Sequence, residues 1–378
     1  MSEVVIPAII IPVVCTLFFF WRLISWRGPR PWLFVLAVPA LALCFWYPLL
    51  GLLDKAQPWS AVLALCGNVW TVTAGFFLCV SLVIEIVRAL AWLYLKSGNG
   101  EGRDVLPARR AVPLALGLLL AVTAYAAFEA QNVRAKHIAI QTDKLPAGVN
   151  NYRIVFVADI HLNELAGEKF LGRITELIKA QNADLLLLGG DVAAYRDMRG
   201  RQKEAAMLAG AMPPNGTLAV LGNHEAMNDH MGNSIPFLKR AWAHVMRGEA
   251  IAVGSVFIVG VDDPKVAEMQ GSTVHDPMII LNRMPHERFV ILLKHRPDIQ
   301  PESIGLFDLQ LSAHTHGGQI WPVSLFMDLF LGSPQGKLTP LEGAGGKSWY
   351  YCTVGAGFNM LPLRFLTPPE VVVIDLVR

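Results

Sequence analysis

Hydrophobic residues follow two different patterns in the two parts of the chain. Before residue 130, uncharged and largely apolar stretches run over residues 4–21, 31–53, 56–84 and 111–128. After residue 150 the apolar runs are short, and Gly or polar residues end each of them. Long apolar stretches predict membrane-spanning helices, whereas short apolar runs predict buried strands of a parallel or mixed sheet.

The first part of the chain is expected to form a transmembrane domain. Each uncharged stretch holds 18 or more residues, enough to cross roughly 30 Å of hydrocarbon as a helix. A cleavable signal peptide is the alternative for the first stretch, but it lacks a basic start and three further stretches follow it. We therefore predict a transmembrane domain over 1–130, a connector over 131–151 and a second domain over 152–378. The four expected helices cover about 4–21, 31–53, 59–84 and 111–130.

Lys and Arg residues in the short loops predict the orientation. The first loop carries three Arg residues and the third carries five basic residues, whereas the second has only Lys55. Basic loops stay in the cytoplasm, so four spans would place both termini and the second domain outside it. The basic residues Arg134, Lys136 and Lys144 after the fourth span weaken this bias. We expect a multi-pass integral membrane protein whose second domain is extracytoplasmic, on the periplasmic side of a bacterial inner membrane.

Five of the short runs end in residues whose side chains bind metal ions. The runs are RIVFVADIH (Asp159, His161), LLLLGGD (Asp191), LAVLGNH (Asn223, His224), VILLKH (His295) and LQLSAHTH (His314, His316). Any one such residue is more often a cap or turn residue, yet five of the ten His residues lie at these ends. Ligands bind beyond the carboxyl ends of parallel strands, so we expect these side chains to converge on a metal site.

The residue types indicate the kind of metal. Two carboxylates, one carboxamide and four imidazoles suit Mn, Fe or Zn better than Mg or Ca, and Mn is the expected ion. Seven ligands are too many for one ion that keeps an open position. Two divalent ions that share a carboxylate fit the number, and such a pair can clamp the attacking and leaving oxygens of a displacement at phosphorus.

The order of these motifs resembles the calcineurin-like metallophosphoesterase family, in its membrane-anchored branch. The matching residues run from Asp159 to Gln319 in HGGQ, and the similarity continues through GAGFNMLPLRF and PPEVVVIDL, so that it covers roughly residues 140–378. The resemblance implies an α/β sandwich of two mixed sheets flanked by helices. We therefore expect N-terminal all-α transmembrane helices followed by this sandwich.

The resemblance also implies roles for individual residues. By motif position the ligands of the first metal are Asp159, His161 and His316, those of the second are Asn223, His295 and His314, and Asp191 bridges the two ions. His224 matches the family's catalytic residue, which stabilises the reacting phosphorus or protonates the leaving oxygen. Two departures from the family pattern are Ala313, where Gly is usual, and Val192-Ala193 after the Gly-Asp motif.

These observations predict a membrane-anchored dinuclear-metal hydrolase that cleaves a phosphoester or pyrophosphate bond. Because it is tethered to a membrane, a lipid or lipid-linked phosphate is the expected substrate. One alternative is an enzyme like the UDP-diacylglucosamine pyrophosphohydrolases of lipid A synthesis, which needs a cytoplasmic active site. Another is a non-catalytic membrane sensor or assembly factor. A net charge of +2 and the lack of a basic stripe argue against nucleic acid binding.

Three further segments carry expectations about structure. Apolar residues at helical spacing predict a helix between Gly172 and Gln181 and another over SIPFLKRAWAHVM, residues 234–246. The segment IWPVSLFMDLFLG, residues 320–332, is either an internal packing helix or an apolar lip that contacts the bilayer or holds an acyl chain.

Overall fold

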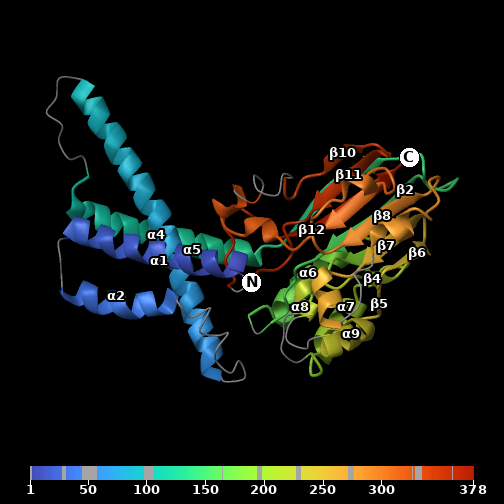
Figure 1. Ribbon diagram of the computed structural model, residues 1–378, viewed down its shortest axis with the longest axis horizontal. Helices are drawn as coiled ribbons and strands as arrows, with labels where there is room; N and C mark the ends of the chain where they lie inside the picture. Colours follow the sequence, from blue (N-terminus) through green and yellow to red (C-terminus); the bar gives the residue numbers. More distant parts are fainter. Residues whose placement is uncertain are drawn as a thin grey trace. The chain divides into compact units, whose positions relative to one another are not determined.

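The chain forms two compact units, residues 1–125 and 126–378. The computed structural model describes residues 2–27, 31–44, 58–97, 106–163, 165–193, 198–226, 231–270, 276–325, 327, 334–359 and 361–378. Figure 1 shows helices in the first unit and two sheets with covering helices in the second.

The described part of the first unit is helical. Its helices are α1 (Ser2–Arg27), α2 (Pro31–Cys44), α4 (Pro58–Ser97) and the first part of α5 (Ala108–Gln131). The Trp70 indole N–H donates to Thr16 Oγ1 at 2.8 Å, which ties α4 to α1. Glu85 of α4 pairs with Arg22 of α1 and with Arg88 one turn away. Glu85 therefore neutralises cationic charge between helices.

Two of the described helical stretches are long and apolar enough to cross a membrane, Leu65–Lys96 and Arg110–Gln131. The stretches Ile10–Trp26 and Val35–Cys44 are apolar but shorter. Residues 45–53 of the second expected span lie outside the described residues. The third expected span, about 59–84, lies within helix α4, which continues to Ser97. The division into four spans stays a prediction.

The second unit contains two six-stranded sheets. The first has strand order β1-β12-β2-β3-β4-β5, formed by Arg134–Gln141, Glu370–Val377, Asn151–Val157, Leu185–Leu188, Thr217–Ala219 and Ala243–Val245. The second has order β10-β11-β9-β8-β7-β6, formed by Thr339–Gly343, Gly346–Cys352, Leu309–Ser312, Phe289–Lys294, Val256–Val261 and Glu249–Val253.

Strand direction places the expected ligand-bearing ends together within each sheet. Strands β2, β3, β4 and β5 are parallel neighbours in the first sheet, and β7, β8 and β9 are parallel in the second. Antiparallel pairs, such as β12 with β2, make both sheets mixed. Residues that follow β2, β3 and β4 therefore leave the first sheet at one edge, and those that follow β8 and β9 do so in the second.

Apolar side chains from both sheets form one buried core between them. Phe156 and Leu187 of the first sheet share this core with Ile291 and Leu311 of the second. A second core lies between the first sheet and helices α6, α7 and α9, and a smaller one packs α11 on the second sheet. The predicted α/β sandwich of two mixed sheets flanked by helices is confirmed.

The remaining described helices of this unit are short. They are α6 (Glu168–Lys179), α7 (Gln202–Ala209), α8 (Asn223–Ala226), α9 (Met231–Arg240), α10 (Pro264–Gln270), α11 (Pro277–Leu281) and the 3₁₀ turns Pro301–Ser303 and His316–Gly318. The helix expected between Gly172 and Gln181 is confirmed as α6, which begins four residues earlier.

Two expectations about local structure are wrong. The connector expected over 131–151 contains strand β1, which pairs in parallel with β12 over its whole length. The helix expected over 234–246 ends at Arg240, and β5 takes up Ala243–Val245 beside β4. In both segments a sheet edge offers hydrogen bonds that local periodicity does not reveal.

Candidate metal centre

The ends of five strands bring the predicted ligands together. Asp159 and His161 follow β2, Asp191 follows β3, Asn223 follows β4, His295 follows β8, and His314 and His316 follow β9. Within each sheet the parallel arrangement brings these strand ends to one edge, and the packing of the two sheets brings the two edges to each other. The structure therefore collects all seven predicted ligands in one place.

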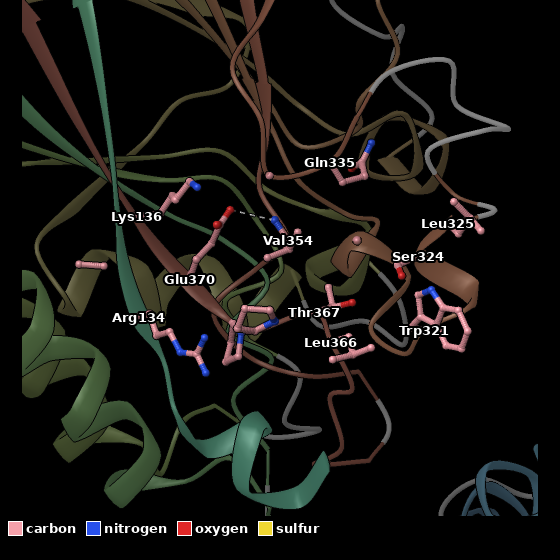
Figure 2. Close-up of a pocket in the computed structure, with 15 residues that line it drawn as sticks. Arg134, Lys136, Trp321, Ser324, Leu325, Gln335, Val354, Leu366, Thr367 and Glu370 are labelled. Atoms are coloured by element: carbon pink, nitrogen blue, oxygen red, sulfur yellow. Dashed lines mark hydrogen bonds between the residues drawn. The ribbon is translucent and has the colours of Figure 1, made fainter. Parts of the chain in front are cut away.

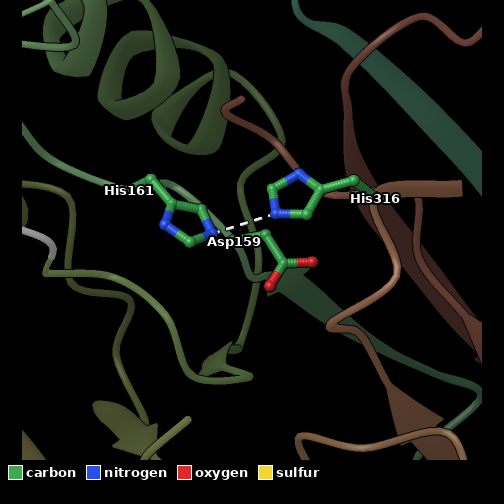
Figure 3. Close-up of side chains that lie close together, drawn as sticks. All are labelled: Asp159, His161 and His316. Carbon is green, nitrogen blue, oxygen red and sulfur yellow. Dashed lines mark hydrogen bonds between the residues drawn. The ribbon is translucent and has the colours of Figure 1, made fainter. Parts of the chain in front are cut away.

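The first cluster consists of Asp159, His161 and His316 (Figure 3). All three side chains are buried, and their nearest potential ligand atoms lie within 4.8 Å of one another. His316 Nε2 and His161 Nε2 are only 2.9 Å apart. The Oδ1 atom of Asp159 is buried and accepts no hydrogen bond within the described chain. These are the donor atoms that a borderline cation would bind.

The second cluster consists of Asp191, His295 and His314, with Asn223 beside them. His295 Nε2 lies 3.2 Å from Asn223 Oδ1, 3.2 Å from His314 Nδ1 and 3.3 Å from Asp191 Oδ2. Three other side chains thus surround one imidazole nitrogen. His314 is half-buried, whereas His295 and Asp191 are buried. Access from solvent is therefore greater at this cluster.

Asp191 lies between the two clusters. Its Oδ2 lies 3.3 Å from His295 Nε2 of the second cluster and 3.6 Å from His161 Nε2 of the first. Its other oxygen, Oδ1, accepts a hydrogen bond from the His224 backbone N–H at 2.8 Å. A carboxylate held between two ligand sets is the arrangement that a bridging ligand requires.

The electrostatics of the clusters suit cations. Burial lowers the pKa of His161 to about 3 and that of His314 to about 4, so these imidazoles are neutral at pH 7 and offer lone pairs. Burial raises the pKa of Asp159 to about 7. For His295 burial acts in the opposite direction, but the Asp191 carboxylate outweighs it and raises the pKa to about 10. Divalent ions would satisfy the lone pairs and the buried carboxylates together.

The backbone at the ligands is strained. Five of the seven predicted ligands have a positive φ: Asp159 (53°), His161 (50°), Asp191 (51°), His314 (79°) and His316 (51°). A side chain other than Gly costs roughly 1–2 kcal/mol in this region. Such strain persists only where surrounding contacts fix the loop, and it concentrates at functional sites.

Glu225 fixes two of these loops, and no role was predicted for it. Its fully buried carboxylate accepts hydrogen bonds from the backbone N–H groups of Asp191, Val192, Ala193 and Gly222, at 2.7 to 3.0 Å. Burial raises the pKa of Glu225 to about 7, with the nearby Asp191 acting in the same direction. The available signal was that Glu225 directly follows Asn223 and His224 in the sequence.

Arg364 fixes the loop behind His316, and it too was missed. Its guanidinium is fully buried and donates to the carbonyls of Gly357, at 2.8 Å, and Val354, at 2.8 Å. Its Nη2 also lies 3.3 Å from His316 Nδ1. Burial lowers its pKa to about 10, so the group remains charged at pH 7. The only signal was an Arg within GAGFNMLPLRF.

Two glycines in the motifs are required by close packing. A Cβ at Gly190 would lie 2.8 Å from His295 Nδ1, and one at Gly222 would lie 2.2 Å from Asp191 Oδ1. Gly190 also has a φ of 90°. Any larger residue would push into the ligands themselves.

The departures from the family pattern leave the ligands in place. Ala313 is buried among the apolar side chains between the sheets, and its φ is not in the left-handed region. Val192 and Ala193 pack in the core beneath α6 and α9 and donate their N–H groups to Glu225. None of these side chains replaces a metal ligand.

His224 lies at the first cluster with its imidazole available. Its ring centroid is 4.6 Å from that of His161, at an interplanar angle of 85°. In the described part of the chain its ring nitrogens have no hydrogen-bond partner, and the side chain is half-buried. A group in this position can reach a molecule bound at the metals.

Comparison with known proteins agrees with this geometry. A family model for calcineurin-like phosphoesterases matches residues 152–318. An uncharacterized metallophosphoesterase of Aquifex aeolicus is 33% identical over 255 residues, which cover 67% of this chain and 95% of that protein. A transmembrane protein with metallophosphoesterase domain from Danio rerio is 27% identical over 90% of this chain and 78% of its own.

A further uncharacterized metallophosphoesterase, from Helicobacter pylori, is 30% identical over 76% of this chain and 77% of its own length. Members of this family use a dinuclear metal centre, and the two adjoining clusters provide the His and Asp groups for one. The chain therefore belongs to the calcineurin-like metallophosphoesterase family.

Proposed function

We propose that the protein is a membrane-anchored hydrolase that uses two divalent metal ions to cleave a phosphoester or pyrophosphate bond in a lipid or lipid-linked substrate. The observation that carries this proposal is the position of Asp191, whose Oδ2 lies within 3.6 Å of an imidazole from each ligand cluster. Two ions sharing one carboxylate suit displacement at phosphorus.

The predicted ligands would bind the two ions in two sets. Asp159, His161 and His316 would hold one ion, Asn223, His295 and His314 the other, and Asp191 both. When bound, such ions supply Lewis-acid charge for phosphate oxygens and acidify water. Imidazole, carboxylate and carboxamide ligands suit Mn, Fe or Zn, and of these we favour Mn.

His224 would act on the substrate directly. Its imidazole stands beside the first cluster and is not hydrogen-bonded to any described residue, so it can donate a proton to the leaving oxygen. Its backbone N–H is fixed on Asp191 Oδ1. The same contact thus positions the proton donor relative to the shared carboxylate.

A membrane-bound substrate is supported by the rest of the chain. Two described stretches are long and apolar enough to cross a bilayer, and relatives from Danio rerio and Bos taurus are named transmembrane proteins with a metallophosphoesterase domain. An enzyme tethered in this way meets lipids at high effective concentration.

The test of this function is turnover of a chromogenic phosphodiester by the purified full-length protein with Mn. We expect hydrolysis that a chelator abolishes and added Mn restores. Metal-loaded protein without turnover of mono-, di- or pyrophosphate esters would instead support a sensor or assembly factor. Lipid profiling of cells that carry wild type or Asp191→Asn would then identify the substrate, which should accumulate in the variant.

We further propose a multi-pass topology with the catalytic domain outside the cytoplasm. A reporter that works only outside the cytoplasm should be active when fused after Arg378 and silent in the loop at 97–103. The reverse result would place the metal centre in the cytoplasm. It would also favour a nucleotide-linked lipid precursor, as in lipid A synthesis, because such nucleotides are cytoplasmic.

A further inference from the structure

The second unit contains a cavity that is separate from the metal centre. Its volume is about 540 Å³, within the range of small-molecule sites. None of the seven predicted ligands lines it, although Gly317 and Val354 do. We call it the rim pocket and define it by Arg134, Lys136, Trp321, Leu325, Leu366 and Glu370 (Figure 2). The proposed hydrolysis does not use it.

One side of the rim pocket is apolar and exposed. The exposed fractions are 44% for Trp321, 60% for Leu325 and 58% for Leu366. The Trp321 backbone N–H donates to the Phe365 carbonyl at 2.9 Å, which brings Leu366 beside the 321–325 segment. Large apolar side chains gathered at one opening mark a binding surface, and Trp is the residue that favours a membrane interface.

The opposite side of the rim pocket is charged. Figure 2 shows Arg134, Lys136 and Glu370 across from Trp321 and Leu325. Arg134 is already paired with Glu129 at 2.7 Å. Lys136 is exposed and forms no ion pair with a described residue, so it is the cation available to an anionic ligand.

Glu370 offers one free oxygen to the rim pocket. The residue is only 8% exposed, and its Oε1 accepts from Tyr351, Thr353 and the Val354 N–H at 2.8 to 3.1 Å. Among the described residues, nothing donates to Oε2. Gly336 also lines the cavity, and a Cβ there would lie 3.9 Å from Oε2, so this oxygen faces the pocket and can accept a charge-assisted hydrogen bond from a cationic group.

Covalent connection ties the rim pocket to an apolar helical stretch. Arg134, in the pocket wall, follows three residues after Gln131, where the apolar stretch Arg110–Gln131 ends. Three extended residues reach about 10 Å at most. The ion pair of Arg134 with Glu129, inside that stretch, shortens this distance further.

We propose that the rim pocket binds the headgroup of a zwitterionic aminophospholipid of the phosphatidylethanolamine type, drawn from the bilayer that holds the apolar helices. The ammonium would contact Glu370, the phosphate would contact Lys136, and the acyl chains would leave along Trp321, Leu325 and Leu366. The lipid is bound and not cleaved there, since no metal ligand reaches the cavity.

The test uses the full chain in bilayers of phosphatidylethanolamine, phosphatidylglycerol and phosphatidylcholine. A photoreactive benzoylphenylalanine replaces Leu366 in one variant and Trp242 in a matched control. Trp242 is also exposed, at 69%, but precedes β5 at the opposite edge of the sheet from β1. We expect lipid adducts at position 366 and few at 242. Equal yields, or adducts with another protein only, would overturn the bilayer contact.

The headgroup is read from the same adducts by mass spectrometry. We expect phosphatidylethanolamine to be enriched about tenfold over its share, as for one charge-assisted contact. Glu370→Gln keeps an oxygen for Tyr351, Thr353 and Val354 but turns an amide N–H₂ to the cavity, so the enrichment should vanish. Headgroup recognition would be refuted if the wild-type adducts matched the lipid composition of the bilayer. It would also be refuted if Glu370→Gln left the enrichment of phosphatidylethanolamine unchanged.

Lys136→Glu provides a variant at an exposed position, should Glu370→Gln fail to fold. It should lower total phospholipid adducts at 366 several-fold, and Lys347→Glu, at an exposed site on β11, should not. Hydrolysis of a soluble diester is measured in parallel. A protein that captures the lipid without hydrolysing the diester would refute the proposed function alone.

Discussion

The two ligand clusters contain similar side chains but are supported in different ways. The first has its own carboxylate, Asp159, and a buried guanidinium, Arg364, behind His316. The second has the neutral carboxamide of Asn223, and a backbone carbonyl, that of Gly189, lies 2.9 Å from His295 Nδ1. Apart from the shared Asp191, the first cluster therefore pairs a buried carboxylate with a buried guanidinium, whereas the second adds a neutral carboxamide and a backbone carbonyl.

Because of this difference, each cluster should lose metal affinity on a different substitution. In both clusters the residues other than Asp191 and the imidazoles sum to no net formal charge, so Asp191 is the shared anion. The Gly189 carbonyl keeps a proton on His295 Nδ1 and leaves Nε2 free to bind metal. A guanidinium cannot accept a proton, so it holds His316 by donation and by charge. Loss of Arg364 should therefore affect the first cluster alone.

The largest effect is expected from substitution of Asp191, which both clusters share. Asp191→Ala should remove both ions and lower turnover by at least about 10³-fold, since several kcal/mol of metal-derived stabilisation are lost. Metal analysis and diester hydrolysis measure this. Asp298→Ala, at an exposed carboxylate that pairs with Lys294, is the control. Full metal content in Asp191→Ala would show that the clusters are independent.

His224→Ala should separate chemistry from metal binding. We expect both ions to remain and turnover to fall by roughly 10²–10⁴-fold, the range for a lost general acid. His244→Ala is the matched control, because its exposed imidazole pairs with Glu249 at 2.9 Å. Unchanged turnover in His224→Ala would leave it a structural residue of the first cluster.

Arg364→Lys tests whether the two clusters are supported separately. The charge is kept but the fork that binds Gly357, Val354 and His316 is lost, so metal affinity at the first cluster should fall about 10–100-fold. Metal titration should then show one tight and one weak site. Arg153→Lys, which alters the pair with Asp375 in the first sheet, should leave both sites tight. Equal weakening of both sites in Arg364→Lys would contradict separate support.

Metal removal, which should abolish turnover, also has an effect on stability that can be measured separately. Ions that bind only the folded state at 100 times their Kd add about 2.7 kcal/mol per site. A chelator should therefore lower the melting temperature of the wild type, and by less in Arg364→Lys. A melting temperature that the chelator does not change would mean that the folded protein does not bind the ions.

The strand runs and the motifs were readable from the sequence because both are local. A buried strand needs a short apolar run, and Asp, Asn and His after such runs are visible as letters. Helix α6 was readable for the same reason. Strand β1 was not, because most of its side chains are exposed and its pairing with β12 is a contact between distant parts of the chain. The helix prediction over 234–246 failed because β5 depends on its pairing with β4, which local periodicity does not reveal.

The fold class, the family and the identity of the converging residues could be predicted without coordinates, because motif order and hydrophobic period are properties of the sequence. How those residues are held depends on tertiary packing. Glu225 accepts from backbone N–H groups more than 30 residues before it, and Arg364 lies 3.3 Å from the Nδ1 of His316, 48 residues before it. Such contacts depend on which loops packing brings within about 3 Å, and spacing along the chain does not encode that distance.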